Sequence, residues 1–265
     1  MSIISLLDRD LLRKEFGSAQ PFPFMVLDDF LNDAFATAAA ASFKPFEEAT
    51  LLGRTFRKVN ESRKVQIVDP SKFPLSIAKV AEALSSPEFL RDLEFITGIS
   101  GLTWDSGYAG GGMHQTAQSG WLDVHVDFNF NRTLQLHRRL NLLLYLNPTW
   151  EESWGGTLEL WNKDVSVCHH KILPLFNRCV IFATSSASYH GVSAVRCPEG
   201  TQRKSFAAYY YTKEAPDHWD GDMHSTIFKA RPDEFMKRHV YMSAESASRK
   251  VASALRRFRG WCARN

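Results

Sequence analysis

Alternating hydrophobic and polar residues dominate the middle of this 265-residue chain. From Leu102 to Thr212, short segments with a period of two follow one another and are separated by Gly and Asn. Such segments are typical of β-strands that bury one face. The expected strands cover 102–108, 113–115, 121–128, 139–146, 157–161, 171–173, 179–182 and 205–211. About eight short strands at this spacing predict an all-β barrel or a double-sheet jelly roll.

The first hundred residues mix helical and strand patterns. We expect a short helix over 2–16 and a strand over 24–27, followed by an Ala-rich helix that begins at Asn32 or Asp33 and ends at Phe43. Alanine is the best helix former, and Asn and Asp are favoured N-caps. The apolar side of the first helix would hold Leu6, Leu7, Leu11 and Phe16.

Alternation over 53–68 predicts a β-hairpin. A helix is expected from Pro74 to about residue 85, and a second follows with Ser86 as its cap and Pro87 at the first helical position. These patterns predict an α+β fold with a mainly β core, a jelly roll flanked by N-terminal helices and a C-terminal helix. The support region, the core and the C-terminal loop with its basic helix would cover 1–100, 101–215 and 216–265, all within one domain.

Basic residues are concentrated at the C-terminal end of the chain. The net charge is +3, but six basic residues and no acid lie in 249–265, so the remainder carries a net charge of −3. This balance gives no reason to expect nucleic acid as a partner. Residues 232–262 are expected to be helical, either docked by one apolar stripe or serving as a dock for an acidic partner or carrier. The stripe consists of Val251, Leu255, Phe258 and Cys262.

Targeting signals and cysteine motifs are not found in the sequence. The first residues lack a basic region, Asp8 and Asp10 interrupt their apolar run, and no apolar run approaches the roughly 18 residues of a membrane span. The four cysteines lack CxxC spacing, which suggests neither a zinc site nor a disulfide framework. We therefore expect a cytoplasmic protein with no membrane partner.

A metal site is suggested by the segment 120–129, which alternates as a strand. His125 and Asp127 point to the same face of that strand, because side chains two apart share a face. An imidazole beside a carboxylate supplies two of the three ligands of a 2-His-1-carboxylate Fe(II) site, which leaves three coordination positions open. A solvated face of an ordinary strand also tolerates this pattern, so the rest of the chain has to decide.

The third ligand has to come from another segment. His190 is the best candidate, because it directly follows an apolar strand and would reach the mouth of a barrel. The competing histidines are His114, His137, His169 and His170. The adjacent pair among them cannot both face inward on a strand.

An anion site is suggested by the strand that follows residue 202. Arg203 shares a face with Ser205, and an arginine inside a barrel needs an anionic partner, for which its planar guanidinium suits a carboxylate. An exposed Arg in the loop before the strand is the alternative. In the apolar strand 139–147, Asn141 and Tyr145 share a face and need partners if buried, although core tyrosines usually bond to backbone.

Together these residues resemble the Fe(II)- and 2-oxoglutarate-dependent oxygenases. His125-x-Asp127, then His190, then Arg203 thirteen residues later, is the spacing that carries the resemblance. The closer likeness is to their prolyl-4-hydroxylase-like branch, through Tyr145-Leu-Asn followed by Trp150 and by Trp154-Gly-Gly-Thr-Leu-Glu. The likeness covers about residues 102–212.

The resemblance implies a double-stranded β-helix with Fe(II) bound by His125, Asp127 and His190. Arg203, helped by Tyr145 and Ser205, would bind the distal carboxylate of 2-oxoglutarate. Gln115 and Asn141 are expected to face inward and are the candidates for binding the other end of 2-oxoglutarate. Relatives carry a tyrosine ahead of the His-x-Asp motif, where this chain offers Gln115 or the earlier Tyr108.

The implied reaction is hydroxylation of an unactivated C–H bond, with O2 and 2-oxoglutarate consumed and succinate and CO2 released. Ascorbate is a further candidate cofactor. Related halogenases carry a small residue in place of the carboxylate ligand, so Asp127 favours hydroxylation. The cofactor supplies the chemistry, and the protein supplies orientation and shielding.

The substrate is not named by the sequence. Without a second peptide-binding domain, a small or carrier-bound molecule is favoured, and a peptidyl proline or another protein residue is the alternative. Residues proposed near the mouth are Asp123, Arg132, His137, Arg138 and Trp219. A non-catalytic cupin-like metal module has no need for Arg203, and a zinc hydrolase would want a general base that no HExxH motif supplies.

Overall fold

The computed structural model describes residues 2–217, 219, 221–234 and 237. The expected basic helix over 232–262 therefore lies almost wholly outside the described residues. None of the helices in the described part combines the length and the apolar character needed to cross a bilayer.

The described part of the chain is built on one curled, mainly antiparallel sheet of thirteen strands. Its main path runs β1-β10-β7-β12-β5-β11-β8-β9, with β3 and β13 also paired to β5, β2 to β3, β4 to β12 and β6 to β7. The strands are β1 Phe24–Leu27, β2 Arg54–Arg57, β3 Glu61–Ile67, β4 Thr103–Trp104, β5 Gly112–Val126, β6 Phe130–Asn131, β7 Leu136–Tyr145, β8 Leu158–Trp161, β9 Cys168–Ile172, β10 Cys179–Ala183, β11 His190–Val192, β12 Gln202–Thr212 and β13 Ile227–Lys229. The predicted double-stranded β-helix with flanking helices is confirmed.

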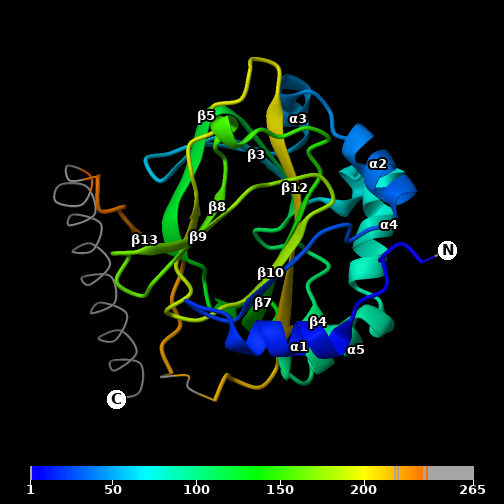
Figure 1. Cartoon of the computed structure of the whole chain (residues 1–265), viewed down its shortest axis with the longest axis vertical. Coiled ribbons are helices and arrows are strands. Elements are labelled where there is room, and N and C mark those ends of the chain that lie inside the picture. The colour runs from blue at the N-terminus through cyan, green and yellow to red at the C-terminus, as the bar shows by residue number, and fades with distance from the viewer. Residues whose placement is uncertain (1, 218, 220, 235–236, 238–265) are drawn as a thin grey trace, which may run out of the picture.

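Helices cover one side of this sheet. Figure 1 shows α2, α4 and α5 stacked along that side and α1 at its lower end. The helices are α1 Arg9–Ser18, α2 Asp33–Ala41, α3 Phe46–Leu52, α4 Leu75–Leu84 and α5 Pro87–Thr97, with short 3-10 turns η1 Pro70–Lys72 and η2 Glu152–Trp154. Asn32 and Ser86 cap α2 and α5 through their side chains, as expected.

The first helix differs from its prediction. It begins at Arg9 and not at residue 2, because Asp8 caps it by accepting a bond from the Leu11 backbone amide. Its buried side chains are Leu12 and Phe16, whereas Leu11 is half exposed. The segment before it runs extended, and Leu6 is fully exposed.

Strands β7 and β12 separate the main core from the functional cavity by simple alternation. Leu142 and Leu144 of β7 and Phe206 of β12 face the helices and belong to the largest hydrophobic cluster, together with Ile77 and Leu84 of α4. The intervening residues of both strands therefore face the opposite way, into the space enclosed by the curled sheet.

Several strand boundaries differ from the expected ones. The segments 113–115 and 121–128 are parts of one strand, β5, whereas 102–108 shortens to β4 because Tyr108 has a positive φ in a turn. Helix α3 and strands β6, β11 and β13 have no counterpart in the prediction.

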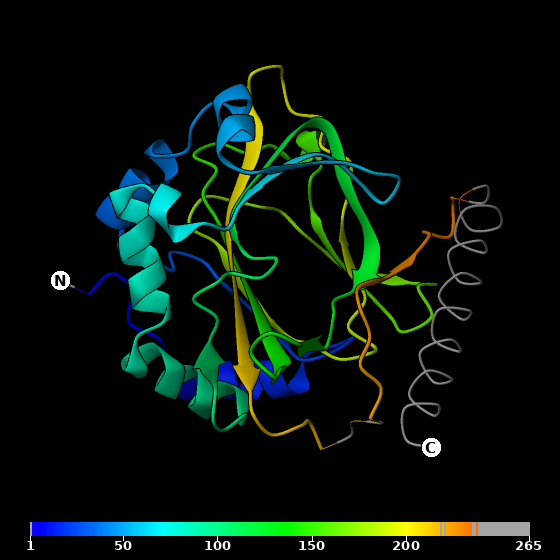
Figure 2. The same ribbon diagram turned by 180° about the vertical axis from the view of Figure 1, so that it is seen from behind.

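The sheet also draws strands from outside the predicted core region. β1 pairs with β10, β3 pairs with β5, and β13 pairs with the end of β5. In Figure 2 the light-blue β2–β3 hairpin extends from the helical side across to β5. The N-terminal hundred residues thus contribute walls of the cavity as well as helices.

Candidate active site

The three predicted metal ligands meet at the end of β5. His125 and Asp127 come from β5 and the residue just after it, and β11 pairs with β5 so that His190 lies directly opposite His125. The Nε2 atoms of His125 and His190 lie 3.6 and 3.5 Å from carboxylate oxygens of Asp127. One ligand atom from each residue lies within 4.8 Å of the others, so one ion can contact all three.

Hydrogen bonds fix both imidazoles for coordination. The Nδ1 atom of His125 donates to the carbonyl of Asp123 at 2.8 Å, and that of His190 donates to the carbonyl of Ser188 at 2.9 Å. A carbonyl only accepts, so Nδ1 carries the proton and Nε2 offers a lone pair to a metal. Burial lowers the pKa of His190 to about 3, which keeps this ring neutral.

Asp127 remains ionised in spite of its burial. Burial would raise its pKa, but the guanidinium of Arg138 and the two imidazoles hold that pKa well below its usual value. Arg138 forms a 3.0 Å ion pair with Asp127 and stacks over the ring of Tyr209. Two imidazoles and one carboxylate, all aimed at one point, are the donor set that suits Fe(II).

A second polar site lies on β12 and β7. Arg203 is buried, as predicted, and its guanidinium carbon lies 4.8 Å from the ring centre of Tyr145. The Arg203 Nη2 and Tyr145 Oη atoms are both buried and lack a hydrogen-bond partner among the described residues. Two unsatisfied donors side by side in a barrel need an acceptor, and a carboxylate of 2-oxoglutarate fits that need. Ser205 is buried on the same face of β12 and lines the cavity.

Gly156 shows how the chain positions this arginine. Its carbonyl accepts a 2.7 Å bond from Nε of Arg203, and its φ is positive. A Cβ at this position would lie 3.0 Å from the Trp150 ring and 3.2 Å from the Arg203 side chain. The Gly-Gly segment of the family motif is therefore required for the close approach of backbone to guanidinium.

Gln115 and Tyr108 do not reach the metal end of the cavity, which corrects two expectations. Gln115 points to the other face of β5, where its amide donates to the Lys44 carbonyl and to Gln202. Tyr108 packs against Phe73 in the main core. Tyr209 does line the cavity, where its ring packs against the Arg138 guanidinium and its hydroxyl donates to the Gly110 carbonyl.

Asn141 lines the cavity as predicted, but both ends of its side chain are already used. Its amide nitrogen donates to Asp127 Oδ2 at 2.7 Å, and its oxygen accepts from Nε of Arg138 at 2.8 Å. In this structure Asn141 orients a metal ligand, and its proposed contact with 2-oxoglutarate stays a prediction.

The competing histidines lie away from the metal. His114 lines the cavity floor beside Gln66, at 3.0 Å between their Nε2 atoms. His137 stacks on Trp219, His169 is exposed, and His170 contacts the carbonyl of Gln20.

Of the residues proposed near the mouth, Arg138 lines the cavity and the others do not. Asp123 is fully buried behind the metal site, and Arg132 is exposed. His137 and Trp219 stack on each other outside the cavity lining.

Metal site and arginine lie in one cavity of about 330 Å³. Sequence reasoning missed several of its wall residues, most of which come from segments far from the motif. These are Arg54, Phe56, Lys64, Phe128, Tyr209 and Phe228. Tyr209 alone had a usable signal, since it alternates in phase with Arg203 along one strand.

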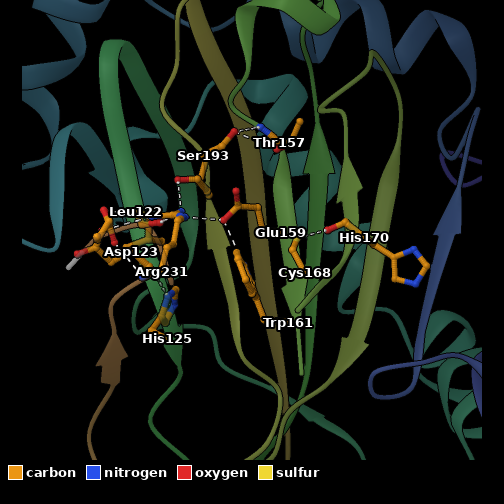
Figure 3. Close-up of polar contacts among 12 residues, drawn as sticks. Leu122, Asp123, His125, Thr157, Glu159, Trp161, Cys168, His170, Ser193 and Arg231 are labelled. Atoms are coloured by element: carbon orange, nitrogen blue, oxygen red, sulfur yellow. Dashed lines mark hydrogen bonds and ion pairs between the residues drawn. The ribbon is translucent and has the colours of Figure 1, made fainter. Parts of the chain in front are cut away.

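Arg231, in the segment after β13, forms hydrogen bonds behind β5, the strand that carries His125. Figure 3 shows the side chain of Arg231 reaching between the strands, where its Nε donates to Glu159 at 2.8 Å. Its Nη2 donates to the carbonyls of Leu122 and Val192. These bonds hold β13 beside the end of β5, with which it pairs. The ring centres of Phe228 in β13 and His125 lie 5.4 Å apart.

Comparisons with known proteins agree with this site. Residues 111–211 match the sequence model of the 2OG-Fe(II) oxygenase superfamily. Prolyl 3-hydroxylase OGFOD1 from Mus musculus is 37% identical over 78 residues, which make up 28% of this chain and 14% of the mouse protein. The match therefore spans well under a quarter of that relative's length.

Two solved structures share the fold. A prolyl hydroxylase from Trichoplax adhaerens, in complex with a hypoxia inducible factor oxygen degradation domain peptide fragment, superposes with a TM-score of 0.56 at 18% identity, covering 77% of this chain and 90% of that one. HygX from Streptomyces hygroscopicus, with nickel, 2-oxoglutarate and hygromycin B bound, gives 0.50 at 10% identity, covering 83% and 96%.

The family match covers both β5, which carries His125, and β12, which carries Arg203, and the structure brings these residues into one cavity. Residues 111–211, which carry the candidate metal ligands and Arg203, match the 2OG-Fe(II) oxygenase superfamily, and the fold around them is shared with a prolyl hydroxylase.

Proposed function

We propose that this protein is a dioxygenase that uses Fe(II), 2-oxoglutarate and O2 to hydroxylate an unactivated C–H bond of a small or carrier-bound molecule. Succinate and CO2 would be the coproducts. The observation that carries the proposal is the pairing, in one cavity, of the His125–Asp127–His190 triad with Arg203, whose unsatisfied Nη2 lies on the same side chain that packs against Tyr145.

Each part of the site has a definite task in this reaction. The triad holds iron on one face and leaves the remaining positions for cosubstrate and O2, and the bound metal supplies the oxidising chemistry. Arg203 and Tyr145 fix the distal carboxylate of 2-oxoglutarate, which orients the cosubstrate before the reaction. Apolar residues around the triad, among them Phe128 and Phe228, exclude bulk water.

Hydroxylation of a peptidyl proline or another protein residue is the second candidate. It is supported by the name of the mouse relative, a prolyl 3-hydroxylase, and by the peptide bound in the Trichoplax structure. The small-molecule reading is supported by the modest cavity, about 330 Å³, and by the hygromycin B bound in HygX, a structure with the same fold.

The decisive experiment measures succinate formation by the purified chain. We expect formation to require both Fe(II) and 2-oxoglutarate, and to be lost in Asp127→Ala. His169→Ala, which removes an exposed histidine, is the matched control and should keep it. Succinate formation that survives Asp127→Ala would contradict the assignment of Asp127 as a metal ligand. Hydrolytic activity that requires only zinc would favour the alternative function, a zinc hydrolase.

The substrate class is tested by the same readout. Small molecules, carrier-bound acyl or aminoacyl groups and proline-containing peptides are screened for stimulated succinate release and a 16-dalton mass gain. Stimulation by peptides alone would favour the second candidate.

We also propose a cytoplasmic location for the protein. This proposal is supported by the sequence, whose four cysteines lack the spacing of a disulfide framework. Fractionation of cells that express the tagged protein tests it.

A further inference from the structure

The floor of the cavity is an ordered grid of side chains from four strands. Residues that lie directly opposite in paired strands share a face, and neighbouring strands are about 4.8 Å apart. Phe56 of β2 pairs with Lys64 of β3, which pairs with Thr116 of β5, which pairs with Arg203 of β12. All four of these residues line the cavity. Lys64 and Arg203 are therefore cations of the same floor, on strands roughly 10 Å apart.

A parallel row repeats this arrangement one step along the strands. It consists of Arg54, Gln66, His114, Ser205 and Tyr145, which are successive cross-strand partners from β2 to β7. The 2-oxoglutarate pocket occupies the β12 and β7 end of the two rows. Arg54 and Lys64, both from the N-terminal hairpin, occupy the other end.

This hairpin end has more donors than acceptors. Arg54 makes no ion pair within the described residues, and its guanidinium carbon rests 4.8 Å from the Phe56 ring centre. Lys64 Nζ lies 3.6 Å from Glu61 Oε2, a distance longer than a hydrogen bond. The Nε1 atom of Trp121 is buried and has no hydrogen-bond partner in the described part of the chain.

Trp121 belongs to the same end of the cavity. Its backbone pairs with Ser62 of β3, two residues before Lys64, and its side chain lines the cavity. Around it the lining is apolar, through Phe56, Leu122 and Val192.

The charges that line the whole cavity also have a positive excess. Four cations line it, Arg54, Lys64, Arg138 and Arg203, against two carboxylates, Glu61 and Asp127. Iron and 2-oxoglutarate would bring charges of +2 and −2, which cancel. A cavity loaded with both would keep a positive excess, and part of that excess lies at the hairpin end, where the two cations Arg54 and Lys64 face the single carboxylate Glu61.

We propose that Arg54, Lys64 and Trp121 form an oxyanion subsite that binds a carboxylate or phosphate group of the primary substrate. The proposal rests on the function proposed above and narrows its substrate to molecules that carry such a group beside an apolar body. Lys64 is largely buried with Glu61 as its ion-pair partner, and Arg54 is exposed at the edge of the cavity with no ion pair among the described residues, so a substrate oxyanion can accept hydrogen bonds from both. The target C–H bond would then lie between this subsite and the metal.

Binding is tested with three probes that share one apolar chain. Hexanoate, hexyl phosphate and hexanamide are titrated calorimetrically into the full chain loaded with Mn(II) and saturating 2-oxoglutarate. At least one of the two anions should bind about tenfold or more tightly than the amide, a difference of about 1.4 kcal/mol. Comparison of the two anions tells a carboxylate site from a phosphate site. Equal binding of all three, or no binding by either anion, would overturn the proposal.

Two variants with opposite expected effects on anion binding distinguish a binding role from a purely structural one. Arg54→Met with Lys64→Met should abolish the advantage of the anions over the amide. Glu61→Gln removes the only carboxylate beside Lys64 and should tighten anion binding severalfold, which a merely structural role would not produce. Lys58→Met, an exposed lysine of the same hairpin outside the cavity lining, should match wild type. Weaker anion binding in Glu61→Gln would contradict the assignment.

Cosubstrate binding is the second readout. Lys64→Met should leave the dissociation constant of 2-oxoglutarate nearly unchanged, whereas Arg203→Met should raise it. An equal rise in both would place Lys64 in the cosubstrate pocket and overturn the subsite. The titrations are repeated without metal in an Arg203→Met background, where the probes cannot use the cosubstrate pocket. If anion binding persists there while the wild-type chain forms no succinate with Fe(II) and 2-oxoglutarate, the proposed function is refuted and the subsite stands.

Discussion

The side-chain amide of Asn141 donates a 2.7 Å hydrogen bond to Oδ2 of Asp127, and its oxygen accepts from Arg138. The metal-binding carboxylate is therefore held by a residue two strands removed from it in the sheet, and its orientation does not depend on β5 alone. Residues that hydrogen-bond to metal ligands commonly contribute to metal binding nearly as much as the ligands themselves.

Asn141→Leu should weaken metal binding by about 10- to 100-fold, because Asp127 loses the donor that orients it. The measurement is an anaerobic titration with Mn(II). If Asn141 instead serves 2-oxoglutarate, the variant would keep its metal affinity and lose cosubstrate affinity. Asn162→Leu, at a turn remote from the cavity, is the control and should bind metal as wild type does.

Arg203 and Tyr145 should differ in the size of their effect on 2-oxoglutarate. Removing one charged hydrogen-bond partner of a buried carboxylate costs about 1.5–3 kcal/mol, so Arg203→Met should raise the dissociation constant by about 10- to 100-fold. Tyr145→Phe removes a single hydroxyl and should cost less. The affinity of Arg203→Lys for 2-oxoglutarate should lie between the affinities of these two variants and that of wild type, because lysine keeps the charge but lacks the planar guanidinium.

Equilibrium titration of 2-oxoglutarate into the Mn(II)-loaded variants gives this order directly. An Arg203→Met protein with wild-type affinity would remove Arg203 from the cosubstrate site. The melting temperature of each variant, measured without ligands, shows whether any loss is due to unfolding.

His114 should make the fold sensitive to acid. Its burial first, and the nearby Lys64 ammonium second, hold its pKa well below the usual value of 6.5. Below pH 6.5 the unfolded chain binds a proton at this histidine and the folded chain does not, so the free energy of unfolding falls as pH decreases. One such group contributes up to about 1.4 kcal/mol per pH unit.

His114→Gln should therefore make the decline of stability below pH 6.5 shallower by up to that amount. Urea unfolding at a series of pH values measures the slope. His169→Gln, at an exposed position, is the matched control and should reproduce the wild-type slope. A slope in His114→Gln as steep as in wild type would show that His114 is protonated in the folded protein.

Arg231 should be important for stability, because its loss leaves Glu159 buried without its ion-pair partner. Glu159 is 4% exposed and accepts a 2.8 Å bond from Arg231, so Arg231→Met should cost about 3–5 kcal/mol in the free energy of unfolding. Arg91→Met breaks an exposed pair with Glu88 and should cost at most about 1 kcal/mol.

The double variant Arg231→Met with Glu159→Gln isolates the cause of that loss. It should recover part of the stability, since the amide removes the unpaired buried charge. Costs that simply add would indicate that Arg231 acts through its backbone contacts at Leu122 and Val192 instead.

Much of the site followed from local patterns along single strands. His125 and Asp127 share a face wherever the strand lies, because two residues make one period. Arg203 and Ser205 share a face for the same reason, and the spacing of these residues with His190 was enough to suggest one iron site and one carboxylate site.

Gln115 shows where a local pattern fails. Unbroken alternation back from His125 puts Gln115 on the metal face of β5. In the folded protein, four residues of β5 between Thr116 and Trp121 lie opposite the single residue Arg63 of β3. This bulge reverses the phase of the strand, so that His114 and Thr116 face the cavity and Gln115 faces away.

The sequence by itself determined the class of fold, the candidate metal ligands and the arginine proposed to bind a carboxylate, because each depends on spacing within a strand or on a specific combination of residue types. Only the tertiary structure decided what surrounds them. Lys64 and Phe228 come from strands that are about 60 residues before and about 100 residues after His125, and their pairing with β5 is set by long-range register. No period within a segment records which distant strand will lie beside it, and it is these neighbours that shape the cavity.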